Sequence, residues 1–470
     1  MNATTPSGHT DQGFIDPVGN RAPFVRTGNE VLFDGVDLSL LARAIGTPAY
    51  VYSATVIDIR FRRLDALFRA QGLRPLIAYA AKANDTLAVL AQLGELGAGA
   101  DVVSEGELWR AIAAGIPAER IVFSGVGKTE GEHRLALELG VRQINVESRE
   151  EFYQLVTVAG GLGRPVSVAL RINPDVGAGT LAQITTGTRD NKFGMPASEA
   201  LDLAQRINHS PLLRFCGVSV HIGSQITNLG PYAAALERTG EVVAQLRELG
   251  VEVLTVDVGG GFGITYQGGE GLDMVRYVAL VAEFARRFQV DIVLEPGRWL
   301  VGPAGLLLTR VLYGKRQVEK RFVIVDAGMN DLMRPALYGA YHEVTSVRDI
   351  PGTRSLADVA GPVCESSDVL AKDRYLPDGL EPGDLVAVLD AGAYGAVMSS
   401  AYNSRRPPAA AMVRAGRWML VRRRPSYDEM LGLDTDRLAC RNLIALPHPA
   451  GALAEADCVA REIRPEEHRK

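Results

Sequence analysis

Cysteine is scarce in this sequence, and its few positions are far apart. The 470 residues include four cysteines, with no C-x-x-C pair and no spacing typical of a metal site. A disulfide framework or a zinc centre is therefore not expected, and a reducing compartment is the natural location. The sequence predicts no metal and a cytoplasmic protein. The four positions are Cys216, Cys364, Cys440 and Cys458.

Long apolar runs and a strong excess of charge are also absent. No apolar run approaches the roughly 20 residues that span a bilayer, and residues 1–20 lack the apolar core of a signal peptide. The net charge is -5, and the densest basic spot, Arg422–Arg424, is more typical of a solvated strand end than of a nucleic-acid patch. We therefore expect neither a membrane nor a nucleic-acid partner.

What the chain has in abundance is an alternation of short apolar runs with helical stretches, starting near Leu76. Eight runs have strand-like composition: Leu76–Ala80, Asp101–Val103, Ile121–Phe123, Gln143–Val146, Val166–Ile172, Phe215–His221, Leu254–Val258 and Ile292–Glu295. The segments between them have helical period, as in Thr86–Leu96, Glu105–Ala114, Glu130–Leu139 and Pro231–Leu249. Eight strands with eight helical connections favour a (β/α)8 barrel over residues 53–304, and a doubly wound sheet is the competing arrangement.

From Gly305 on, strand-like segments follow one another closely, with turn signals between them. They are Leu306–Tyr313, Arg321–Val325, Leu356–Val359, Leu385–Leu389, Ala410–Arg414 and Arg417–Arg422. This pattern predicts a second, antiparallel β domain over residues 305–434, completed by strand-like pieces within residues 29–52. Residues 1–28 are expected to be a flexible lead-in, and residues 435–470 match no clear pattern.

Polar and glycine-rich positions fall at the C-terminal ends of the predicted barrel strands. A barrel of this kind carries its active site at that end. The positions, in strand order, are Lys82, Asp101, Arg171, His221, Gly259–Gly261 and Glu295. A lone lysine after an apolar strand is more often a surface residue. In a partly desolvated pocket, however, Lys82 would have a lowered pKa and could form an imine with an aldehyde.

Two loops have features of a phosphate site. Glycines at 259–261 let backbone N–H groups approach an anion, and the loops after strands seven and eight are the usual phosphate site of a barrel. In the eighth loop, the Glu295 carboxylate can hold a protonated ring nitrogen, and the Arg298 guanidinium can pair with a phosphate or a carboxylate. His221 can stack on a planar ring, with Ser224 bonding phosphate. A glycine turn, a surface ion pair and a structural histidine are the alternatives.

Further motifs occur in order along the chain. They are Gly99–Leu108, Asn191–Gly194, Met333–Tyr338, Cys364–Asp368, Ala391–Tyr394, Tyr402–Arg405 and Arg424–Tyr427. With the loops above, they resemble the alanine-racemase-like family of pyridoxal-phosphate enzymes (fold type III) and, within it, the diaminopimelate decarboxylases, over roughly Asn29–Leu433. The resemblance implies a carboxy-lyase with pyridoxal 5'-phosphate as its cofactor.

The resemblance also implies a role for each matching residue. Lys82 resembles the lysine that carries the cofactor as a Schiff base, and Glu295 resembles the partner of its ring nitrogen, which keeps the ring an electron sink. Cys364 resembles the group that protonates the α-carbon from the other subunit, so that the active site is shared in a homodimer. The remaining implied cofactor contacts are Asp101, Arg171, His221, Ser224, Gly260, Gly261, Pro296, Gly297, Arg298 and Tyr394.

Substrate choice depends on the distal end of the substrate's side chain. Arg298 and Arg334 can bind a distal carboxylate, and Glu365 can bind a distal ammonium. Tyr338 and Tyr394 are further substrate contacts. An arginine pair is poorly matched to ornithine, whose distal end is purely cationic. This combination favours an amino-carboxylate end over ornithine, and the resemblance implies that the amino-acid substrate is meso-2,6-diaminopimelate, decarboxylated to L-lysine and CO2 in the last step of lysine biosynthesis.

Three departures from the family pattern leave alternatives open. The family usually has a valine at the position of Ala81 and a histidine close to the position of Leu181. It commonly has an asparagine where this chain has Val126-Gly127. A decarboxylase of the same fold could act on a related amino acid or a carboxylated polyamine. A racemase suits the Cys364-Glu365 motif less well. A non-catalytic pyridoxal-phosphate-binding protein would resemble a bare barrel, and the residues after Gly305 argue against it.

Overall fold

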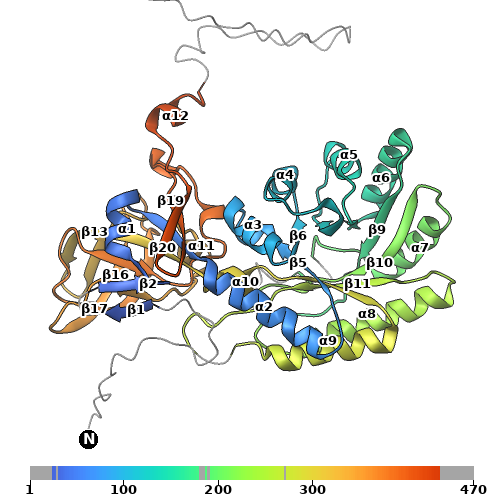
Figure 1. The fold of residues 1–470 in the computed structure, drawn as a ribbon, viewed down its shortest axis with the longest axis horizontal. Coiled ribbons are helices and arrows are strands. Elements are labelled where there is room, and N and C mark those ends of the chain that lie inside the picture. Colours follow the sequence, from blue (N-terminus) through green and yellow to red (C-terminus); the bar gives the residue numbers. More distant parts are fainter. Residues whose placement is uncertain (1–23, 28–29, 179–185, 188–190, 269–270, 435–470) are drawn as a thin grey trace, which may run out of the picture. The chain divides into compact units, whose positions relative to one another are not determined.

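The computed structural model describes residues 24–27, 30–178, 186–187, 191–268 and 271–434 (Figure 1). The described residues up to Arg424 form one compact unit, and those from Pro425 on belong to a second. In the second unit, helix α12 (Tyr427–Leu431) begins with a capping box, in which the side chains of Ser426 and Glu429 each accept from the other's backbone N–H. The predictions for residues 1–23, for the loop around Leu181 and for residues 435–470 lie outside the described residues.

The larger unit contains a closed barrel of eight parallel strands, in the order β10-β11-β12-β5-β6-β7-β8-β9. The strands are β5 (Leu76–Ala80), β6 (Gly99–Val102), β7 (Ile121–Phe123), β8 (Gln143–Val146), β9 (Val166–Arg171), β10 (Leu213–Ser219), β11 (Thr255–Gly260) and β12 (Asp291–Glu295). The first and last strands pair through Leu76 and Val293, which closes the barrel and excludes a doubly wound sheet. The predicted (β/α)8 barrel is confirmed.

Helices cover the outside of the barrel (Figure 1). They are α2 (Ala54–Ala70), α3 (Leu87–Glu95), α4 (Glu105–Ala113), α5 (Glu130–Leu139), α6 (Arg149–Leu162), α7 (Ala197–Asn208), α8 (Gly230–Glu248) and α9 (Met274–Phe288). Several begin at a side-chain cap: Ser104 and Ser148 each accept from the backbone N–H three residues later. Helix α9 buries Tyr277, Val281 and Ala285, at the four-residue spacing of an amphipathic face.

The inside of the barrel changes from apolar to polar along the strands. A small cluster, separate from the main core, is formed by Ala78, Val122 and Val293 from three strands. Two residues further along the same chain segments stand Ala80, Ser124 and Glu295. Side chains two residues apart in a strand point the same way, so these three continue the inward face toward the C-terminal end. The barrel thus presents Ser124 and Glu295 to the end where its active site is expected.

A nine-stranded sheet forms the second part of the larger unit. Its order is β17-β16-β14-β13-β4-β19-β20, with β18 beside β13 and β15 beside β18. The strands are β4 (Ala49–Ser53), β13 (Gly305–Arg316), β14 (Arg321–Val325), β15 (Val344–Ser346), β16 (Arg354–Ala360), β17 (Val369–Pro377), β18 (Leu385–Val388), β19 (Ala409–Arg414) and β20 (Arg417–Arg422). Strand β4 lies between β13 and β19, so the predicted N-terminal contribution is confirmed. Most pairs are antiparallel, as predicted, and β4–β19 and β14–β16 are parallel.

Smaller elements complete the unit. A three-stranded antiparallel sheet consists of β1 (Phe24–Thr27), β2 (Glu30–Phe33) and β3 (Val36–Asp37), and α1 (Leu38–Ile45) follows it. Residues 24–27, expected to be part of a flexible lead-in, form a strand because β2 provides partners for their backbone groups. The short helices are η1 (Ala81–Ala83), η2 (Ala118–Arg120), α10 (Arg298–Val301), α11 (Arg334–Tyr338), η4 (Ala396–Met398) and η5 (Tyr402–Ser404).

Candidate active site

Lys82 lies in η1, directly after barrel strand β5. Its Nζ donates to Oδ2 of Asp101 on the neighbouring strand β6, and the Asp101 side chain is fully buried. The other oxygen of Asp101, Oδ1, is buried and has no hydrogen-bond partner within the described chain. About a third of the Lys82 side chain, 33%, remains exposed. The amine is therefore held by one carboxylate and still open to a small molecule.

The prediction that the Lys82 pKa is lowered is wrong for the protein without a bound ligand. Burial acts to lower this pKa, but the charges of Asp101 and Glu295 oppose it and raise the pKa above the ordinary lysine value. The two carboxylates belong to different strands, so their joint effect requires the closed barrel. Lys82 must give up a proton before it can attack an aldehyde, and Asp101 is the carboxylate already bonded to its Nζ.

Glu295 ends strand β12 and is almost fully buried. Ser124 Oγ donates to its Oε1 at 3.2 Å, and His221 Nδ1 lies 3.6 Å from its Oε2. Burial acts to raise the pKa of Glu295, but the interaction with His221 and the charge of Lys82 lower it below the ordinary value. Glu295 is therefore an ionised carboxylate, which is the form that can hold a proton on a ring nitrogen.

Asp257, on strand β11, is a buried carboxyl whose pKa is shifted in the opposite direction to that of Glu295. Its oxygens accept from the Asn145 amide and from the Gly259 N–H, each at 3.0 Å, and no ion pair in the described chain includes it. Burial, and then the charge of Glu295, raise the pKa of Asp257 well above its ordinary value. We therefore assign the proton of this pair to Asp257. Asn145 connects the two carboxyls, because its amide also donates at 3.1 Å to the Ser124 hydroxyl that binds Glu295.

The loop after β11 requires glycine for steric reasons. Gly261 has a φ of 86°, and a Cβ there would lie 2.3 Å from the carbonyl oxygen of Gly223. A Cβ at Gly260 would lie 1.9 Å from the carbonyl oxygen of Glu295. Glycine thus lets the loops after β10, β11 and β12 meet at backbone contact. This close backbone packing fixes the loops that surround the barrel mouth.

One cavity at the C-terminal end of the barrel brings eight of the sixteen predicted site residues together. The Gly260 N–H donates to His221 Nδ1 at 3.2 Å, and the Ala80 N–H donates to the Pro296 carbonyl oxygen at 3.1 Å, which ties the loops around the cavity to each other. The sequence offers no signal for the apolar members, because apolar residues near strand ends are common. The lining residues are Ala80, Lys82, His221, Ser224, Gly261, Phe262, Glu295, Gly297, Arg298 and Tyr394.

Two buried arginines approach the same residue, Tyr266. Arg298 Nη1 donates to Tyr266 Oη at 2.8 Å, and its Nη2 donates to Ser224 Oγ at 3.2 Å. The Cζ of Arg334 lies 4.7 Å from the centroid of the Tyr266 ring. The Nε of each arginine is buried without a hydrogen-bond partner, and neither arginine forms an ion pair within the described ranges. Nothing in the sequence marks Tyr266, which follows the glycine loop without a motif of its own.

The β domain reaches the barrel site through Tyr394. Its backbone N–H donates to the carbonyl oxygen of Ala83 at 2.7 Å, next to Lys82. Its φ of 55° is unusual for a residue with a side chain, and the hydrogen bond helps to fix it. The Cζ of Arg298 lies 4.7 Å from the Tyr394 ring centroid. Tyr338, half-buried at the end of α11, also interacts electrostatically with Arg298.

Other predicted residues lie away from this cavity. Arg171 ends β9 and its Nη1 donates to Glu147 Oε1 at 2.8 Å, so its guanidinium is already paired. Cys364 is a free, exposed thiol whose backbone N–H donates to Asn403 Oδ1 at 2.9 Å. Glu365 is exposed as well. Within one chain, therefore, neither Cys364 nor Glu365 lines the Lys82 cavity.

A second cavity adjoins Lys82 on the side of helix α4. Its lining residues are Lys82, Asp85, Ser104, Gly106, Glu107, Arg110, Val397 and Met398. Glu107 Oε2 accepts from the Val103 N–H at 2.9 Å. Burial raises the pKa of Glu107 to about 7. The sequence gives no reason to single out Glu107, because a glutamate in the first turn of a helix is common.

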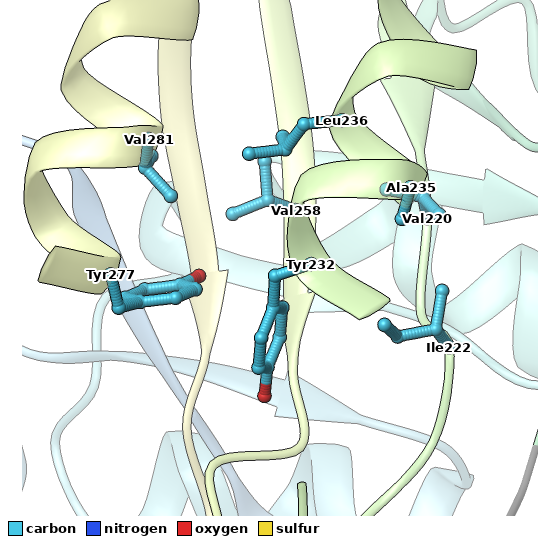
Figure 2. Close-up of a pocket in the computed structure, with 8 residues that line it drawn as sticks. All are labelled: Val220, Ile222, Tyr232, Ala235, Leu236, Val258, Tyr277 and Val281. Carbon is cyan, nitrogen blue, oxygen red and sulfur yellow. The ribbon is translucent and has the colours of Figure 1, made fainter. Parts of the chain in front are cut away.

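An apolar cavity lies between barrel strands and helices (Figure 2), and it shares no lining residue with the polar cavity. It is lined by Val220, Ile222, Tyr232, Ala235, Leu236, Val258, Tyr277 and Val281. The rings of Tyr232 and Tyr277 meet edge to face, with centroids 4.9 Å apart. Tyr232 Oη donates to the carbonyl oxygen of Gly260 at 3.0 Å. This cavity therefore belongs to the layer that supports the glycine loop from behind.

The donor set fits pyridoxal phosphate. The Lys82 amine, the ionised Glu295 and the Arg298 guanidinium match the aldehyde, the ring nitrogen and the phosphate of that cofactor. The unpartnered Arg298 Nε and Asp101 Oδ1 are buried polar atoms that a polar ligand would satisfy. In contrast, the described residues contain no group of three or more His, Cys, Asp or Glu side chains suited to a metal ion. None of the helices in the described part is long and apolar enough to cross a membrane.

Fold and donor set together define a pyridoxal-phosphate enzyme of the barrel class. Residues 56–302 match the family model for the pyridoxal-dependent decarboxylase, pyridoxal binding domain. The diaminopimelate decarboxylase of Zymomonas mobilis is 43% identical over 412 residues, which are 87% of this chain and 97% of that protein. The one from Pseudomonas aeruginosa is 46% identical over 402 residues, 85% of this chain and 96% of that protein.

A solved structure agrees with these relatives. Diaminopimelate decarboxylase from Helicobacter pylori, complexed with L-lysine, is similar with a TM-score of 0.81 and 40% identity, over 86% of this chain and all of that chain (100%). The present chain therefore belongs to the diaminopimelate decarboxylase family of pyridoxal-dependent decarboxylases. The predicted family, cofactor and enzyme class, a carboxy-lyase, are confirmed.

Proposed function

We propose that this chain decarboxylates meso-2,6-diaminopimelate to L-lysine and CO2. The observation that carries the proposal is the pair of buried arginines, Arg298 and Arg334, with no carboxylate partner among the described residues. Buried guanidiniums without counter-ions need anionic ligands, because an unpaired buried charge is strongly unfavourable. A cofactor phosphate and a distal substrate carboxylate provide two such anions near Lys82. The names of the relatives point to the same substrate.

Each residue around Lys82 has a chemical task in this reaction. Pyridoxal phosphate, when bound, supplies an electron sink for the electron pair that remains as CO2 leaves. Glu295 would hold a proton on the ring nitrogen, and the Lys82 amine would hold the cofactor at its aldehyde group. Asp101 fixes the Lys82 amine, and His221 is held beside the ring position by the Gly260 N–H. Ser224 and the glycine loop serve the phosphate side.

The second carboxyl group of the substrate distinguishes it from simpler diamino acids. We assign this group to Arg334 and to the part of Arg298 that faces Tyr266, with hydrogen bonds from Tyr338 and Tyr394. The distal ammonium is assigned to Glu365. Ornithine and lysine, presented as substrates, would offer only an ammonium there and would leave a guanidinium unpaired.

We further propose a homodimer with a shared site, in the cytoplasm. Cys364 and Glu365 are exposed and do not line the cavity of their own chain, which supports their use by a partner subunit. From there the Cys364 thiol would return a proton to the carbon that lost CO2. A thiol with this task must stay reduced, which suits the cytoplasm. The division into a barrel over residues 53–304 and a β domain over 29–52 and 305–434 also remains a proposal.

A substrate panel tests the proposed function. The purified, cofactor-loaded protein is given meso-diaminopimelate, L-ornithine and L-lysine at equal concentrations, and CO2 release is measured. We expect diaminopimelate to be preferred by roughly 100-fold or more, because an unpaired buried charge costs several kcal/mol. A preference for ornithine or lysine would overturn the substrate assignment, and CO2 from none of them would overturn the proposed function.

A further inference from the structure

His342 is a fully buried histidine of the β domain, between α11 and β15, that no sequence motif singles out. Both of its ring nitrogens have partners. Nδ1 lies 2.8 Å from the carbonyl oxygen of Leu389, and Nε2 lies 2.7 Å from Nη1 of Arg334. The backbone carbonyl oxygen of His342 accepts from Arg374 Nε at 3.2 Å and from its Nη2 at 3.1 Å. The ring is therefore fixed from the β domain side.

The two partners determine which ring nitrogen carries the proton. A carbonyl oxygen can only accept a hydrogen bond, and a guanidinium nitrogen can only donate one. Nδ1 therefore carries the hydrogen toward Leu389, and Nε2 accepts from Arg334 with its lone pair. Burial, and then the charge of Arg334, lower the pKa of His342 to about 3, in keeping with a neutral ring.

A neutral acceptor has a particular consequence for Arg334. It fixes one end of the guanidinium without cancelling its charge, whereas an aspartate or glutamate in the same place would do both. The rest of the guanidinium lies over Tyr266, whose ring meets that of His342 edge to face at 5.3 Å. The Arg334 Nε remains buried and without a hydrogen-bond partner. Arg334 is thus oriented and still carries its full positive charge.

We propose that His342 is a positioning residue that aims Arg334 at the distal carboxylate of the substrate. The inference rests on the proposed function, in which Arg334 binds that carboxylate. It adds that the orientation of Arg334 depends on a neutral histidine locked in one tautomer. Loss of CO2 from one end of diaminopimelate leaves the other carboxylate in place, so L-lysine still carries the group that Arg334 binds. The compound 1,5-diaminopentane is the same chain without it.

Two conservative substitutions of His342 test separately the hydrogen-bond acceptor of its ring, Nε2, and the donor, Nδ1–H. His342→Gln places an amide near the position of Nε2 and keeps an acceptor for Arg334, whereas His342→Asn reaches only the position of Nδ1 and loses that acceptor. In His342→Asn we expect the KM for diaminopimelate and the Ki for L-lysine to rise about tenfold or more. In His342→Gln both should stay within about threefold of wild type. The Ki for 1,5-diaminopentane and the Kd for pyridoxal phosphate should not change in either variant.

Several outcomes would overturn the inference. One is a His342→Asn protein with unchanged constants, and another is a Ki for 1,5-diaminopentane that rises in parallel with that for L-lysine. In a background of Arg334→Leu, the asparagine substitution should have no further effect on KM, and an additive effect would count against positioning through Arg334. A wild-type protein that releases no CO2 from diaminopimelate would overturn the proposed function instead.

A measurement on the wild-type protein covers the case in which His342→Asn fails to fold. The protein is labelled with 15N at its seven histidines, and the His342 ring is assigned from the signals missing in His342→Gln. We expect the neutral Nδ1–H tautomer throughout about pH 5 to 8. An Nε2–H tautomer or a charged ring in that range would contradict the proposed orientation of Arg334.

Discussion

Two buried polar clusters lie near Lys82 and differ in sign. The acidic cluster (Asp101, Asp257 and Glu295) lies inside the barrel, and the basic cluster (Arg298 and Arg334) lies around Tyr266, toward the β domain. The acidic cluster is only partly neutralised by its own surroundings: Asp257 keeps its proton, Asp101 bonds the Lys82 amine, and Glu295 is left ionised. The basic cluster has no counter-ions among the described residues. The acidic cluster therefore holds protons and cations in place, whereas the basic cluster is suited to bind anions that arrive with the ligands.

The largest expected effect is that of Lys82→Ala. It removes the amine that we propose holds the cofactor, and Asp101 loses the cation that is paired with it. We expect activity to fall by roughly 10³-fold or more, with loss of the near-visible absorbance of the lysine-bound cofactor. Activity and absorbance that both persisted would show that another group holds the cofactor.

A matched pair of amide substitutions tests the difference between two members of the acidic cluster. Glu295→Gln removes an ionised carboxylate and should lower kcat by on the order of 10²-fold. Asp257→Asn replaces a carboxyl that already carries its proton, but its amide can accept from only one of Asn145 and Gly259, so kcat should fall by less than about tenfold. Steady-state kinetics at one pH measure both. An equal loss in the two variants would mean that the proton is not on Asp257.

Cys364→Ala tests whether the site extends to a second chain. We expect turnover to fall by about 100-fold while the cofactor absorbance persists, because the thiol is proposed to act as an acid and not as a cofactor contact. Mixing Lys82→Ala and Cys364→Ala chains should restore activity. If subunits exchange freely, half of the dimers are mixed and one of their two sites is intact, so about a quarter of wild-type activity is expected. A mixture as inactive as its components would argue against a shared site.

The smallest expected effect concerns Glu107, beside the acidic cluster. Burial raises its pKa to about 7 from an ordinary 4.5, so the folded chain retains this proton where the unfolded chain loses it. The resulting stability is present below about pH 4.5 and is lost as the pH rises toward 7. The stability of Glu107→Gln does not depend on this proton. The Tm of the variant minus the Tm of the wild type should therefore increase from pH 5 to pH 8. A constant difference in Tm would indicate an ordinary, solvated carboxyl.

Much of the barrel follows from the strand pattern alone. Leu76–Ala80, Ile121–Phe123 and Gln143–Val146 are strands with the predicted bounds, because short apolar runs between helical segments have few other solutions. Strand β17 (Val369–Pro377) is less visible, since charged residues at 372–374 interrupt its apolar pattern. The parallel pairing of β4 with β19 joins segments from opposite ends of the chain, and no local pattern indicates its direction.

The residues of the site likewise include some that the sequence predicts and some that it does not. Lys82, His221 and Glu295 lie at the C-terminal ends of barrel strands, so the rule that active sites lie at that end is enough to predict their proximity. Tyr266 and His342 lie outside the strand ends and act through contacts made only in the folded chain. The raised pKa of Lys82 is of this second kind, because two carboxylates from separate strands outweigh the effect of burial. Sequence position indicates which groups meet, and the folded surroundings decide their charge.

The most direct test of the central claim is to assay CO2 and L-lysine together from meso-diaminopimelate. The purified protein is loaded with pyridoxal phosphate, and Lys82→Ala serves as the matched control. We predict equal amounts of CO2 and L-lysine from the wild-type protein and neither product from the variant. A cofactor-loaded protein that yields no L-lysine would contradict the account of the basic cluster and of the reaction it serves.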